Sequence, residues 1–290
     1  MFSSIISKIK KKKIKKGLSK KVVLEIEKIS KKLNSKNDIS FSHSGHLGDL
    51  INSLPVIKET AKKKKCSLFV NIKKKVGKEN IDSLHPSKDV FLNEKSFNMI
   101  LPLLKKQPFL SRVEILKKEK IDINLDFFRN LPINFNMDSV RWYSHLTGVN
   151  PDLTKPYLLE VKKNKKFKKS IVFMRSLRRQ NKNLKFNFLN KYNNLLFIGL
   201  RNEYLDLKKQ IKNLQFHDCK DFLEMAQIIM SCKLFIGNLS FGFTIAEALK
   251  VPRLLESYLD FPLVYPNGKK GYEFYFQIHF EKFVKKILKH

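Results

Sequence analysis

Short apolar runs alternate with amphipathic stretches along most of this chain, which is the pattern of strands followed by helices. In the first half, residues 39–44 and 66–72 predict buried strands, and residues 50–65 between them predict a helix with one apolar face. Two strands separated by one helix form the βαβ unit of a parallel sheet. Further strands are expected at residues 99–104 and 121–127.

The same alternation starts again in the second half of the chain. The expected strands are residues 170–174, 195–200 and 234–237, and the expected helices are residues 184–192, 203–214 and 221–231, the last capped by Asp221. Aromatic residues spaced along residues 272–288 predict a closing amphipathic helix. The fold class is therefore α/β, with two Rossmann-like domains that face a cleft.

Prolines and lysines mark a boundary between the two halves, at Pro151, Pro156 and the lysine-rich residues 161–170. We divide the chain into four parts on this basis. They are a basic helical leader at residues 1–36, a Rossmann-like domain at 37–160, a second one at 161–268 and the closing helix at 269–290.

The leader carries apolar residues at steps of three or four, which place one apolar stripe on a helix. Two interpretations remain open. The stripe packs on the body of the protein, or the helix lies on an anionic membrane surface with its lysines toward the headgroups. Packing is favoured for residues 18–33, whereas the density of lysine favours the membrane for the first sixteen residues.

Composition changes this picture mainly through charge. The 290 residues are 42% hydrophobic, enough to bury a sizeable core, and the formal net charge is +33. Clustered basic residues are typical of nucleic-acid binding. Only eight of the 59 basic residues are Arg, however, and Arg is the residue that reads phosphate and guanine with two hydrogen bonds. We therefore interpret the lysine excess as compositional bias and expect no specific nucleic-acid partner, with nucleic-acid binding kept as a third alternative.

The three cysteines are scattered and include no Cys-x-x-Cys pair, so neither a disulfide framework nor a thiolate zinc site is expected. This usage fits a reducing, cytoplasmic setting. The apolar stretches are shorter than the ~18 residues of a membrane span, and the early lysines do not fit a signal peptide. The histidines lack the spacing of a metal site, and no metal or other cofactor is expected.

Two glycine-containing loops each follow a strand and lead into a helix, the place where parallel α/β sheets bind ligands. They lie in residues 40–55 (SFSHSGHLGDLINSLP) and 233–252 (KLFIGNLSFGFTIAEALKVP). A helix N-terminus presents backbone N–H groups and the positive end of the helix dipole, which suit a phosphate. A GxSxG elbow, a Walker loop and a complete GxGxxG are absent from the sequence, which disfavours a hydrolase, a P-loop kinase and a standard dinucleotide dehydrogenase.

The residues in these two stretches resemble glycosyltransferase family 9, the lipopolysaccharide heptosyltransferase group, which has the two-domain GT-B fold. The first motif, G-x-x-G-D-x-x-x-x-L-P, is formed by Gly45, Gly48, Asp49, Leu54 and Pro55. The second consists of Asp221, Glu224, Ala226, Ile229, residues 234–238, Ser240, Ala246, Ala248, Leu249, Val251 and Pro252. The resemblance covers most of residues 39–260 and implies an N-terminal acceptor domain and a C-terminal nucleotide-sugar domain.

The resemblance implies that Asp49 is the general base, which takes the proton of the acceptor hydroxyl as that hydroxyl attacks the sugar. A carboxylate suits the role because the transition state resembles an oxocarbenium ion. The alternative is that Asp49 caps the helix that starts at Leu50. The acceptor-binding candidates are the other residues of this loop: Ser44, Gly45, His46 and Gly48.

The donor loop departs from the usual G-N-D-S-G-P-x-H of the family. Leu239, Phe241 and Thr244 replace its acidic residue, second glycine and histidine. Ser240 and Thr244 still offer hydroxyl groups to a diphosphate. The donor-binding candidates in this stretch are Gly237, Asn238, Ser240, Thr244 and Glu247.

Glu247 has two interpretations. It resembles the glutamate that other GT-B enzymes place at the ribose of the donor, or it forms a Thr-x-x-Glu capping box with Thr244.

An arginine cluster, Arg175, Arg178 and Arg179, follows the first strand of the second half. The family has basic residues after this strand that approach the donor phosphates. The resemblance therefore implies that Arg175 and Arg178 neutralise the leaving nucleoside diphosphate. The alternative is an exposed loop of solvated charge.

Together these patterns predict a cytoplasmic, metal-independent glycosyltransferase, peripheral to the inner membrane, that moves a sugar from a nucleotide donor to a cell-surface glycan or glycolipid precursor. The alternative is a non-catalytic GT-B-like binding protein whose altered donor loop has lost the nucleotide. Phe241 and Phe243 inside the presumed pocket would favour that alternative.

Overall fold

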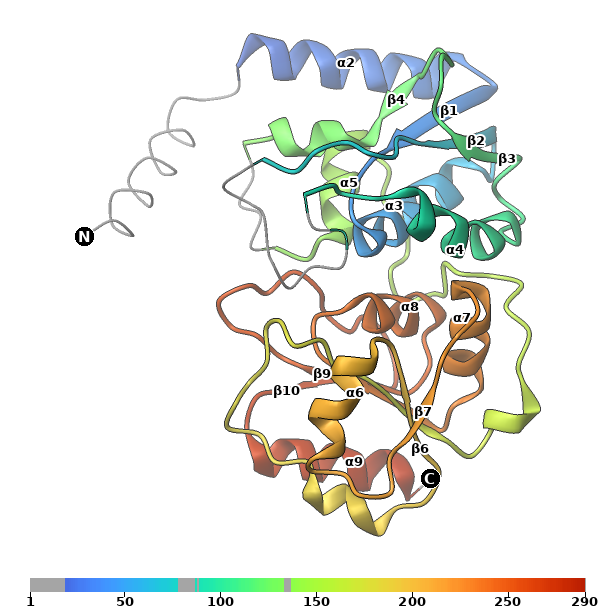
Figure 1. Ribbon diagram of the computed structural model, residues 1–290. Coiled ribbons are helices and arrows are strands. Elements are labelled where there is room, and N and C mark those ends of the chain that lie inside the picture. Colours follow the sequence, from blue (N-terminus) through green and yellow to red (C-terminus); the bar gives the residue numbers. More distant parts are fainter. Residues whose placement is uncertain (1–18, 78–86, 88, 133–136, 290) are drawn as a thin grey trace.

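Two α/β lobes, each built around its own parallel sheet, make up the computed structural model of the chain (Figure 1). The structure describes residues 19–77, 87, 89–132 and 137–289. The N-terminal sheet has the strand order β3-β2-β1-β4, and the C-terminal sheet has the order β10-β9-β8-β5-β6-β7. The paired strands of both sheets run parallel. This architecture confirms the predicted α/β fold with two Rossmann-like domains.

The N-terminal lobe begins with the predicted strand-helix-strand unit. Its strands are β1 (Asp38–His43), β2 (Lys65–Val70), β3 (Arg112–Ile115) and β4 (Ile123–Asn124), and its helices are α2 (Lys20–Ser35), α3 (Leu47–Thr60), α4 (Glu94–Lys105) and α5 (Val140–Thr147). β1 pairs with β2 along its whole length and with β4 on its other side. The loop that follows β1 therefore emerges at the middle of the sheet.

The strand expected at residues 99–104 is wrong. These residues lie inside α4, because the apolar positions of this stretch recur at helical spacing and form the buried face of the helix. Asn93 caps the helix, its side-chain oxygen accepting a hydrogen bond from the Ser96 N–H (2.9 Å). A short apolar run does not by itself distinguish a strand from a buried helix, which explains the error.

The strand expected at residues 121–127 is shorter than predicted. β4 ends at Asn124, whose side-chain oxygen accepts a hydrogen bond from the Asp126 N–H (3.0 Å) and turns the chain into the 3₁₀ helix η2 (Leu125–Asn130). Residues three apart lie on the same side of a 3₁₀ helix. The turn therefore places Asp126 and Arg129 together at the end of the sheet.

α2 packs its apolar stripe on the N-terminal lobe. Val22 and Ile29 are buried, and the Lys32 ammonium donates a hydrogen bond to the Asp122 carbonyl (2.5 Å). The packing interpretation of the leader therefore holds for α2, whereas the membrane interpretation of the first sixteen residues lies outside the described residues. None of the helices that the structure describes has both the length and the apolar character of a membrane span.

The C-terminal lobe repeats the alternation of strands and helices. Its strands are β5 (Ile171–Met174), β6 (Leu195–Ile198), β7 (Gln215–His217), β8 (Leu234–Gly237), β9 (Arg253–Glu256) and β10 (Gly271–Phe274). Its helices are α6 (Arg201–Lys208), α7 (Phe222–Ser231), α8 (Phe241–Leu249) and α9 (Gln277–Leu288), with the 3₁₀ helices η3 (Lys165–Phe167) and η4 (Asn187–Lys191). Asp221 caps α7 as predicted, since its carboxylate accepts a hydrogen bond from the Glu224 N–H (2.8 Å).

Three expectations in this lobe need correction. The helix expected at residues 203–214 is shorter, because α6 ends at Lys208. The helix expected at residues 184–192 forms only the short η4. The closing segment is not a single helix, because its first residues form β10 and only the rest forms α9. β10 pairs with β9, with Gly271 opposite Arg253, and so satisfies backbone groups that β9 would otherwise leave exposed at the sheet edge.

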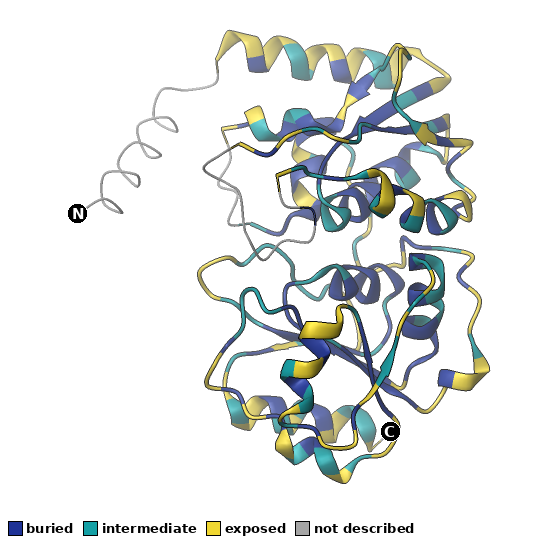
Figure 2. Ribbon diagram, viewed as in Figure 1, coloured by how far each residue is buried: buried dark blue, intermediate teal, exposed yellow. Residues whose placement is uncertain are grey.

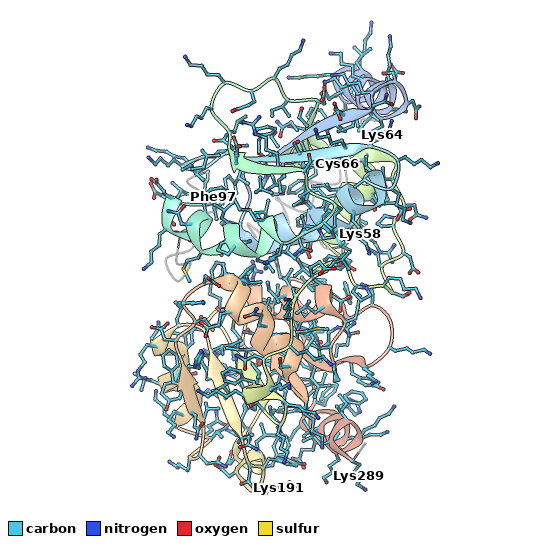
Figure 3. The ribbon with its side chains drawn as sticks, turned by 90° about the vertical axis from the view of Figure 1, so that its right-hand side faces the viewer. Lys58, Lys64, Cys66, Phe97, Lys191 and Lys289 are labelled. Atoms are coloured by element: carbon cyan, nitrogen blue, oxygen red, sulfur yellow. The ribbon has the colours of Figure 1, made fainter. Side chains whose placement is uncertain are left out.

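Helices from both lobes meet at the boundary between them. α3 packs on α8, and α4 packs on α7. Figure 2 shows that α8 is largely buried at this boundary. The lysines labelled in Figure 3 lie in both lobes, with Lys58 near the boundary and Lys191 and Lys289 at the far end of the C-terminal lobe. Positive charge is therefore spread over both lobes.

Candidate active site

The glycine-containing loop of the N-terminal lobe connects β1 to α3. His46 occupies the N-cap position of α3, and Asp49 is the third residue of the helix, with a side chain that is 23% exposed. The alternative that Asp49 is the N-cap is therefore wrong. A carboxylate in the first turn still interacts favourably with the helix dipole, and its partial exposure leaves it open to a substrate.

A chain of hydrogen bonds holds this loop in place. The Gly45 N–H donates to His43 Nδ1 (2.8 Å), so His43 carries its proton on Nε2 and donates it to the Tyr143 oxygen (2.8 Å). Tyr143 in turn donates to the backbone carbonyl of Asp49 (3.0 Å). Burial lowers the pKa of His43 to about 4, so the imidazole is neutral at pH 7. The loop that carries Asp49 is thus tied to α5 through Tyr143.

An arginine lies beside the Asp49 carboxylate. Arg129 Nη2 is 3.8 Å from Asp49 Oδ2, and Arg129 Nη1 donates to Asp126 Oδ1 (2.7 Å). The guanidinium stacks over the Phe91 ring at 4.5 Å and the Phe128 ring at 4.4 Å. Arg129 is therefore in contact with two rings and hydrogen-bonded at one end to a carboxylate.

Asp126 anchors this cluster. It accepts hydrogen bonds from the Ser44 N–H (3.3 Å), from the Ser44 hydroxyl and from the Lys74 ammonium (3.2 Å). Burial alone would raise the pKa of Asp126, but these donors and Arg129 outweigh burial and hold the pKa below its usual range. Ser44, an acceptor-binding candidate, is thus engaged by Asp126.

His46, another acceptor-binding candidate, lies at the boundary between the lobes. Its Nδ1 is 3.1 Å from the Phe91 carbonyl, and its ring meets the Phe91 ring edge to face at 5.2 Å. Burial lowers the pKa of His46; the Asp49 carboxylate opposes this shift, and the positive charge of Arg178 adds to it. The charges of Asp49 and Arg178 therefore act on the pKa of His46 in opposite directions.

Asn238 of the second motif is hydrogen-bonded to the backbone of residues 176–178, in the segment that carries the arginine cluster. Its side-chain oxygen accepts a hydrogen bond from the Ser176 N–H (2.9 Å), and its amide donates to the carbonyls of Ser176 (2.9 Å) and Arg178 (2.8 Å). Asn238 is fully buried. It therefore positions the backbone that carries Arg178, and its side chain is engaged by that backbone.

At Gly237, an added Cβ would lie 2.7 Å from the Met174 carbonyl oxygen, so the close approach of β8 to β5 requires glycine.

The two motifs meet where α3 faces α8. An added Cβ on Gly48 would lie 3.5 Å from the Thr244 hydroxyl oxygen, which itself donates to the Ser240 carbonyl (3.3 Å). Ser240 is the N-cap of α8, and its hydroxyl donates to the Asn238 carbonyl (3.1 Å). The predicted acceptor and donor motifs are therefore adjacent, although Gly48 and Thr244 are 196 positions apart in the sequence.

The aromatic residues of the donor loop pack within the C-terminal lobe. Phe243 is fully buried in the core, 6.4 Å from the Phe235 ring, and the Phe241 ring lies 4.6 Å from the Phe222 ring of α7. These contacts account for both phenylalanines through packing between α8, β8 and α7.

The side chain of Arg175 has a different partner from the donor phosphates that we predicted. Its Nε and Nη2 donate to the two oxygens of Glu256, at 2.6 and 2.8 Å, and its guanidinium stacks over the Phe186 ring at 4.7 Å. The pair is buried. Since a two-point ion pair already satisfies the guanidinium, the prediction that Arg175 neutralises the donor diphosphate is corrected to a structural role.

Glu247 is also engaged inside the protein. Arg253 Nε donates to its Oε2 (2.5 Å), the Lys250 ammonium pairs with its Oε1, and the Asn267 N–H donates to the same oxygen (3.0 Å). The N-cap of α8 is Ser240, so Thr244 and Glu247 do not form a capping box. The capping-box interpretation of Glu247 is therefore wrong, and the residue is the centre of a buried ion-pair network.

Sequence reasoning missed Lys74, Asp126, Arg129 and Tyr143. The available signal was the Asp-x-x-Arg spacing, which begins two residues after the observed end of β4. It was lost because residues 125–127 were assigned to the strand rather than to the turn that follows it. Lys74 and Tyr143 come from distant segments, and their sequence positions carry no such signal.

In the described part of the chain, no group of three His, Cys, Asp or Glu side chains is arranged to hold a metal ion.

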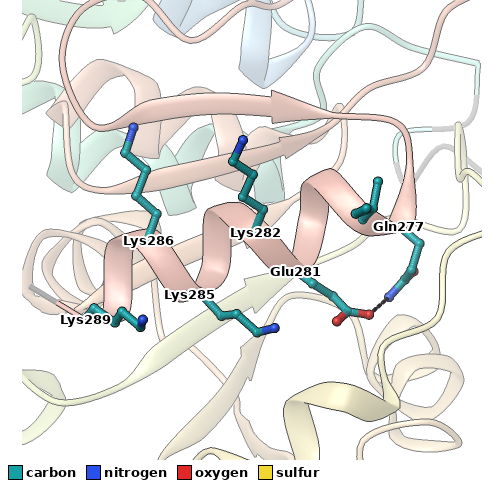
Figure 4. A pocket seen from close by; sticks show the side chains of 7 residues that line it. Gln277, Glu281, Lys282, Lys285, Lys286 and Lys289 are labelled. Atoms are coloured by element: carbon teal, nitrogen blue, oxygen red, sulfur yellow. Dashed lines mark hydrogen bonds between the residues drawn. The ribbon is translucent and has the colours of Figure 1, made fainter.

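A groove of about 660 Å³ lies along α9 and is lined by Gln277, Ile278, Glu281 and four lysines (Figure 4). α9 lies at the far end of the C-terminal lobe from α8 (Figure 1). The lysine side chains extend from an exposed helix face, where ammonium groups stay hydrated. We locate the candidate active site at the motif loops instead, because polar groups from both lobes converge there.

Comparison with known proteins supports this assignment of the fold. Neither a protein-family model nor a curated protein sequence matches the chain. The structure of a family 9 glycosyl transferase from Veillonella parvula has a TM-score of 0.55, with 10% identity over 90% of this chain and 91% of that one. E. coli heptosyltransferase WaaC, solved with ADP, has a TM-score of 0.54, with 11% identity over 86% of this chain and 99% of that one.

A third similar structure is the iron-containing dodecameric glycosyltransferase TibC from enterotoxigenic E. coli H10407. It has a TM-score of 0.55 and 16% identity, and the match covers 83% of this chain and 63% of that one. The chain therefore has the GT-B fold of family 9 glycosyltransferase structures, which confirms at the level of fold the resemblance that the two motifs predicted. At these identities the likeness establishes the fold, and the activity rests on the site.

Proposed function

We propose that this protein is a glycosyltransferase that moves a sugar from a nucleotide-diphosphate donor to a glycan or glycolipid acceptor. One observation carries the proposal: the first turn of α3, which carries Asp49, and α8, which Ser240 caps, come from different lobes, and they meet where Gly48 faces Thr244. In α/β proteins such loops at the carboxyl ends of parallel strands are the places where ligands bind. The fold shared with family 9 structures supports the same conclusion.

Asp49 acts as the general base of the proposed reaction. The acceptor hydroxyl attacks the anomeric carbon of the donor sugar and transfers its proton to the Asp49 carboxylate. The new bond forms between the acceptor oxygen and the anomeric carbon. The bond from that carbon to the diphosphate oxygen breaks, and its electron pair leaves with the nucleoside diphosphate.

Arg178 and the N-terminus of α8 stabilise the leaving diphosphate. Asn238 fixes the backbone of Arg178, and Ser240 opens α8 next to it. The helix N-terminus presents backbone N–H groups and a partial positive charge to the phosphates. The guanidinium adds a full charge where negative charge develops in the transition state. These groups supply the charge neutralisation that a metal ion would otherwise provide.

The experiment starts from the full chain and a panel of nucleotide sugars, with release of the nucleoside diphosphate and thermal stabilisation as readouts. We expect one nucleotide class to stabilise the protein, and Asp49→Asn to abolish turnover while that stabilisation persists. Asp152→Asn is the matched control, because Asp152 is an exposed aspartate of the same chain whose carboxylate bonds only Thr154 among the hydrogen bonds described. Absence of a response to every nucleotide and nucleotide sugar would refute the proposal.

Binding of a nucleotide without any turnover, unchanged by Asp49→Asn, would instead identify the non-catalytic binding protein. The packing of Phe241 and Phe243 within the C-terminal lobe is the reason we place the enzyme first.

A further inference from the structure

Arg129 makes more contacts than its ion pair with Asp49 alone, because it also bonds to Asp126 and lies over two aromatic rings. The guanidinium lies over the Phe91 and Phe128 rings, at 4.5 and 4.4 Å from their centroids. The Phe128 ring stacks on the Trp142 ring at 4.8 Å, and the Phe91 ring contacts His46 at 5.2 Å. Two ring pairs, one on η2 and α5 and the other beside the start of α3, therefore contact the guanidinium.

Asp126 holds one end of the Arg129 guanidinium. It accepts from Arg129 Nη1 at 2.7 Å and is itself held by Ser44 and Lys74. Asp126 is buried, with 8% exposure, so it cannot follow Arg129 if the arginine moves. Asp126 bonds to Nη1 of the guanidinium beside the two rings. The other terminal nitrogen, Nη2, therefore faces Asp49 Oδ2, at 3.8 Å.

We propose that Arg129 is a positioning residue for Asp49: it holds Oδ2 of the carboxylate through Nη2 and so leaves Oδ1 to take the proton of the acceptor hydroxyl. This inference rests on the proposed function, since it assigns Arg129 a part in the same reaction. The physical reason is that a carboxylate on the first turn of a helix has several rotamers, and a base must lie within hydrogen-bond reach of the proton that it removes. A misplacement of about 1 Å at such a group costs roughly 100-fold in rate.

A purely structural role for Arg129 is the competing explanation, because the same contacts also connect η2 to the loop after β1. The two roles differ in what restores activity. A structural role needs the covalent side chain, whereas a positioning role needs only a guanidinium over the rings. Removal of the side chain leaves a slot of matching shape for free guanidinium ion.

The test compares Arg129→Ala with Arg112→Ala in the full chain, with diphosphate release as the assay. Arg112 is the matched control: in the same lobe it also pairs with a carboxylate, Glu114 (2.6 Å), and lies over a ring, Phe69 (5.2 Å), but at β3 and away from the motif loops. We expect Arg129→Ala to lower kcat about 100-fold with the donor KM changed less than about threefold. Added guanidinium at millimolar concentration should restore at least tenfold of that loss, and Arg112→Ala should behave as the wild type.

Arg129→Lys provides a second variant if the alanine variant does not fold. It retains the charge but not the planar fork, so we expect a fall in kcat of about tenfold or more with the unfolding transition unchanged. Wild-type kcat in Arg129→Lys, or a loss in Arg129→Ala that guanidinium does not restore, would overturn the inference. A wild-type chain that releases no diphosphate from any nucleotide sugar would refute the proposed function itself, so the two failures are distinguishable.

Discussion

Gly48 faces Thr244 across the boundary between the lobes, and an added Cβ on Gly48 would lie 3.5 Å from the Thr244 hydroxyl oxygen. The first residues of α3 therefore pack directly on the middle of α8. Both helices carry the predicted site residues. The spacing of the two helices thus depends on the size of the side chain at position 48.

Substitution of Gly48 tests this relationship. Alanine fits at an ordinary van der Waals distance, so we expect Gly48→Ala to change the free energy of unfolding by less than about 0.5 kcal/mol. Gly48→Val adds bulk that has no space, and we expect a loss of about 1–3 kcal/mol together with a larger radius of gyration, as the helices separate. Urea unfolding and small-angle X-ray scattering measure both effects. Equal stability of the two variants would contradict the packing of α3 on α8.

Gly45→Ala tests the hydrogen-bonded chain behind Asp49. The added methyl group would lie 2.4 Å from His43 Cε1, and His43 cannot turn away without losing its bonds to Gly45 and Tyr143. We expect a loss of about 1–3 kcal/mol in the free energy of unfolding. In the His43→Ala background the clash is absent, so the same change should cost much less. Additive effects of the two substitutions would show that the ring is not the obstacle.

Arg175 and Arg178 form a matched pair that separates structure from binding. Arg175→Met leaves Glu256 buried without its partner, and we expect a loss of about 3–5 kcal/mol in the free energy of unfolding with nucleotide affinity retained in the folded fraction. Arg178→Met should do the opposite, with weaker nucleotide binding and a smaller change in stability. Unfolding curves and nucleotide titrations decide the matter. A loss of nucleotide affinity confined to Arg175→Met would reverse our correction.

Asp138 makes the folded protein less stable at neutral pH. Burial, with the Glu247 carboxylate nearby, raises its pKa to about 6, although Asn267 donates to it at 3.1 Å. The folded state binds the proton more tightly than the unfolded state, so this group's contribution to stability is largest below about pH 4 and is lost as the pH rises to 6. We expect Asp138→Asn to raise the free energy of unfolding at pH 8 by about 1–2 kcal/mol, measured by urea titration. The exposed control Asp152→Asn should give no such gain.

His43 imposes the opposite pH dependence. Burial lowers its pKa to about 4, so the unfolded state binds the proton more tightly, and stability falls as the pH drops from about 6.5 to 4. In the wild type this loss is partly offset by the gain from Asp138 over an overlapping range. We therefore expect Asp138→Asn to reveal a steeper decline of stability in acid than the wild type shows. Parallel pH profiles for the two proteins would refute this account.

The strand-helix alternation and both motif loops were readable from the sequence, because buried strands and helix caps leave local patterns. Residues 39–44 and 234–237 were predicted as strands and form β1 and β8, and Asp221 caps α7 as expected. The errors at residues 99–104 and 272–288 arose where tertiary contacts decide. α4 buries an apolar run that also suits a strand, and β10 exists because the edge of β9 accepts it.

The sequence by itself determined the α/β class, the two lobes and the two loops that end their strands, since each rests on residues close together in the chain. Only the tertiary structure decided which charged residues belong to the candidate site. Arg175 and Glu247 have the residue types that bind a donor, yet buried partners, Glu256 and Arg253, already satisfy them. The sequence did not predict Arg129 as a site residue, yet Arg129 lies beside Asp49. The reason is that a charge is available for chemistry only if the fold has not already paired it, and pairing depends on segments that are distant in sequence.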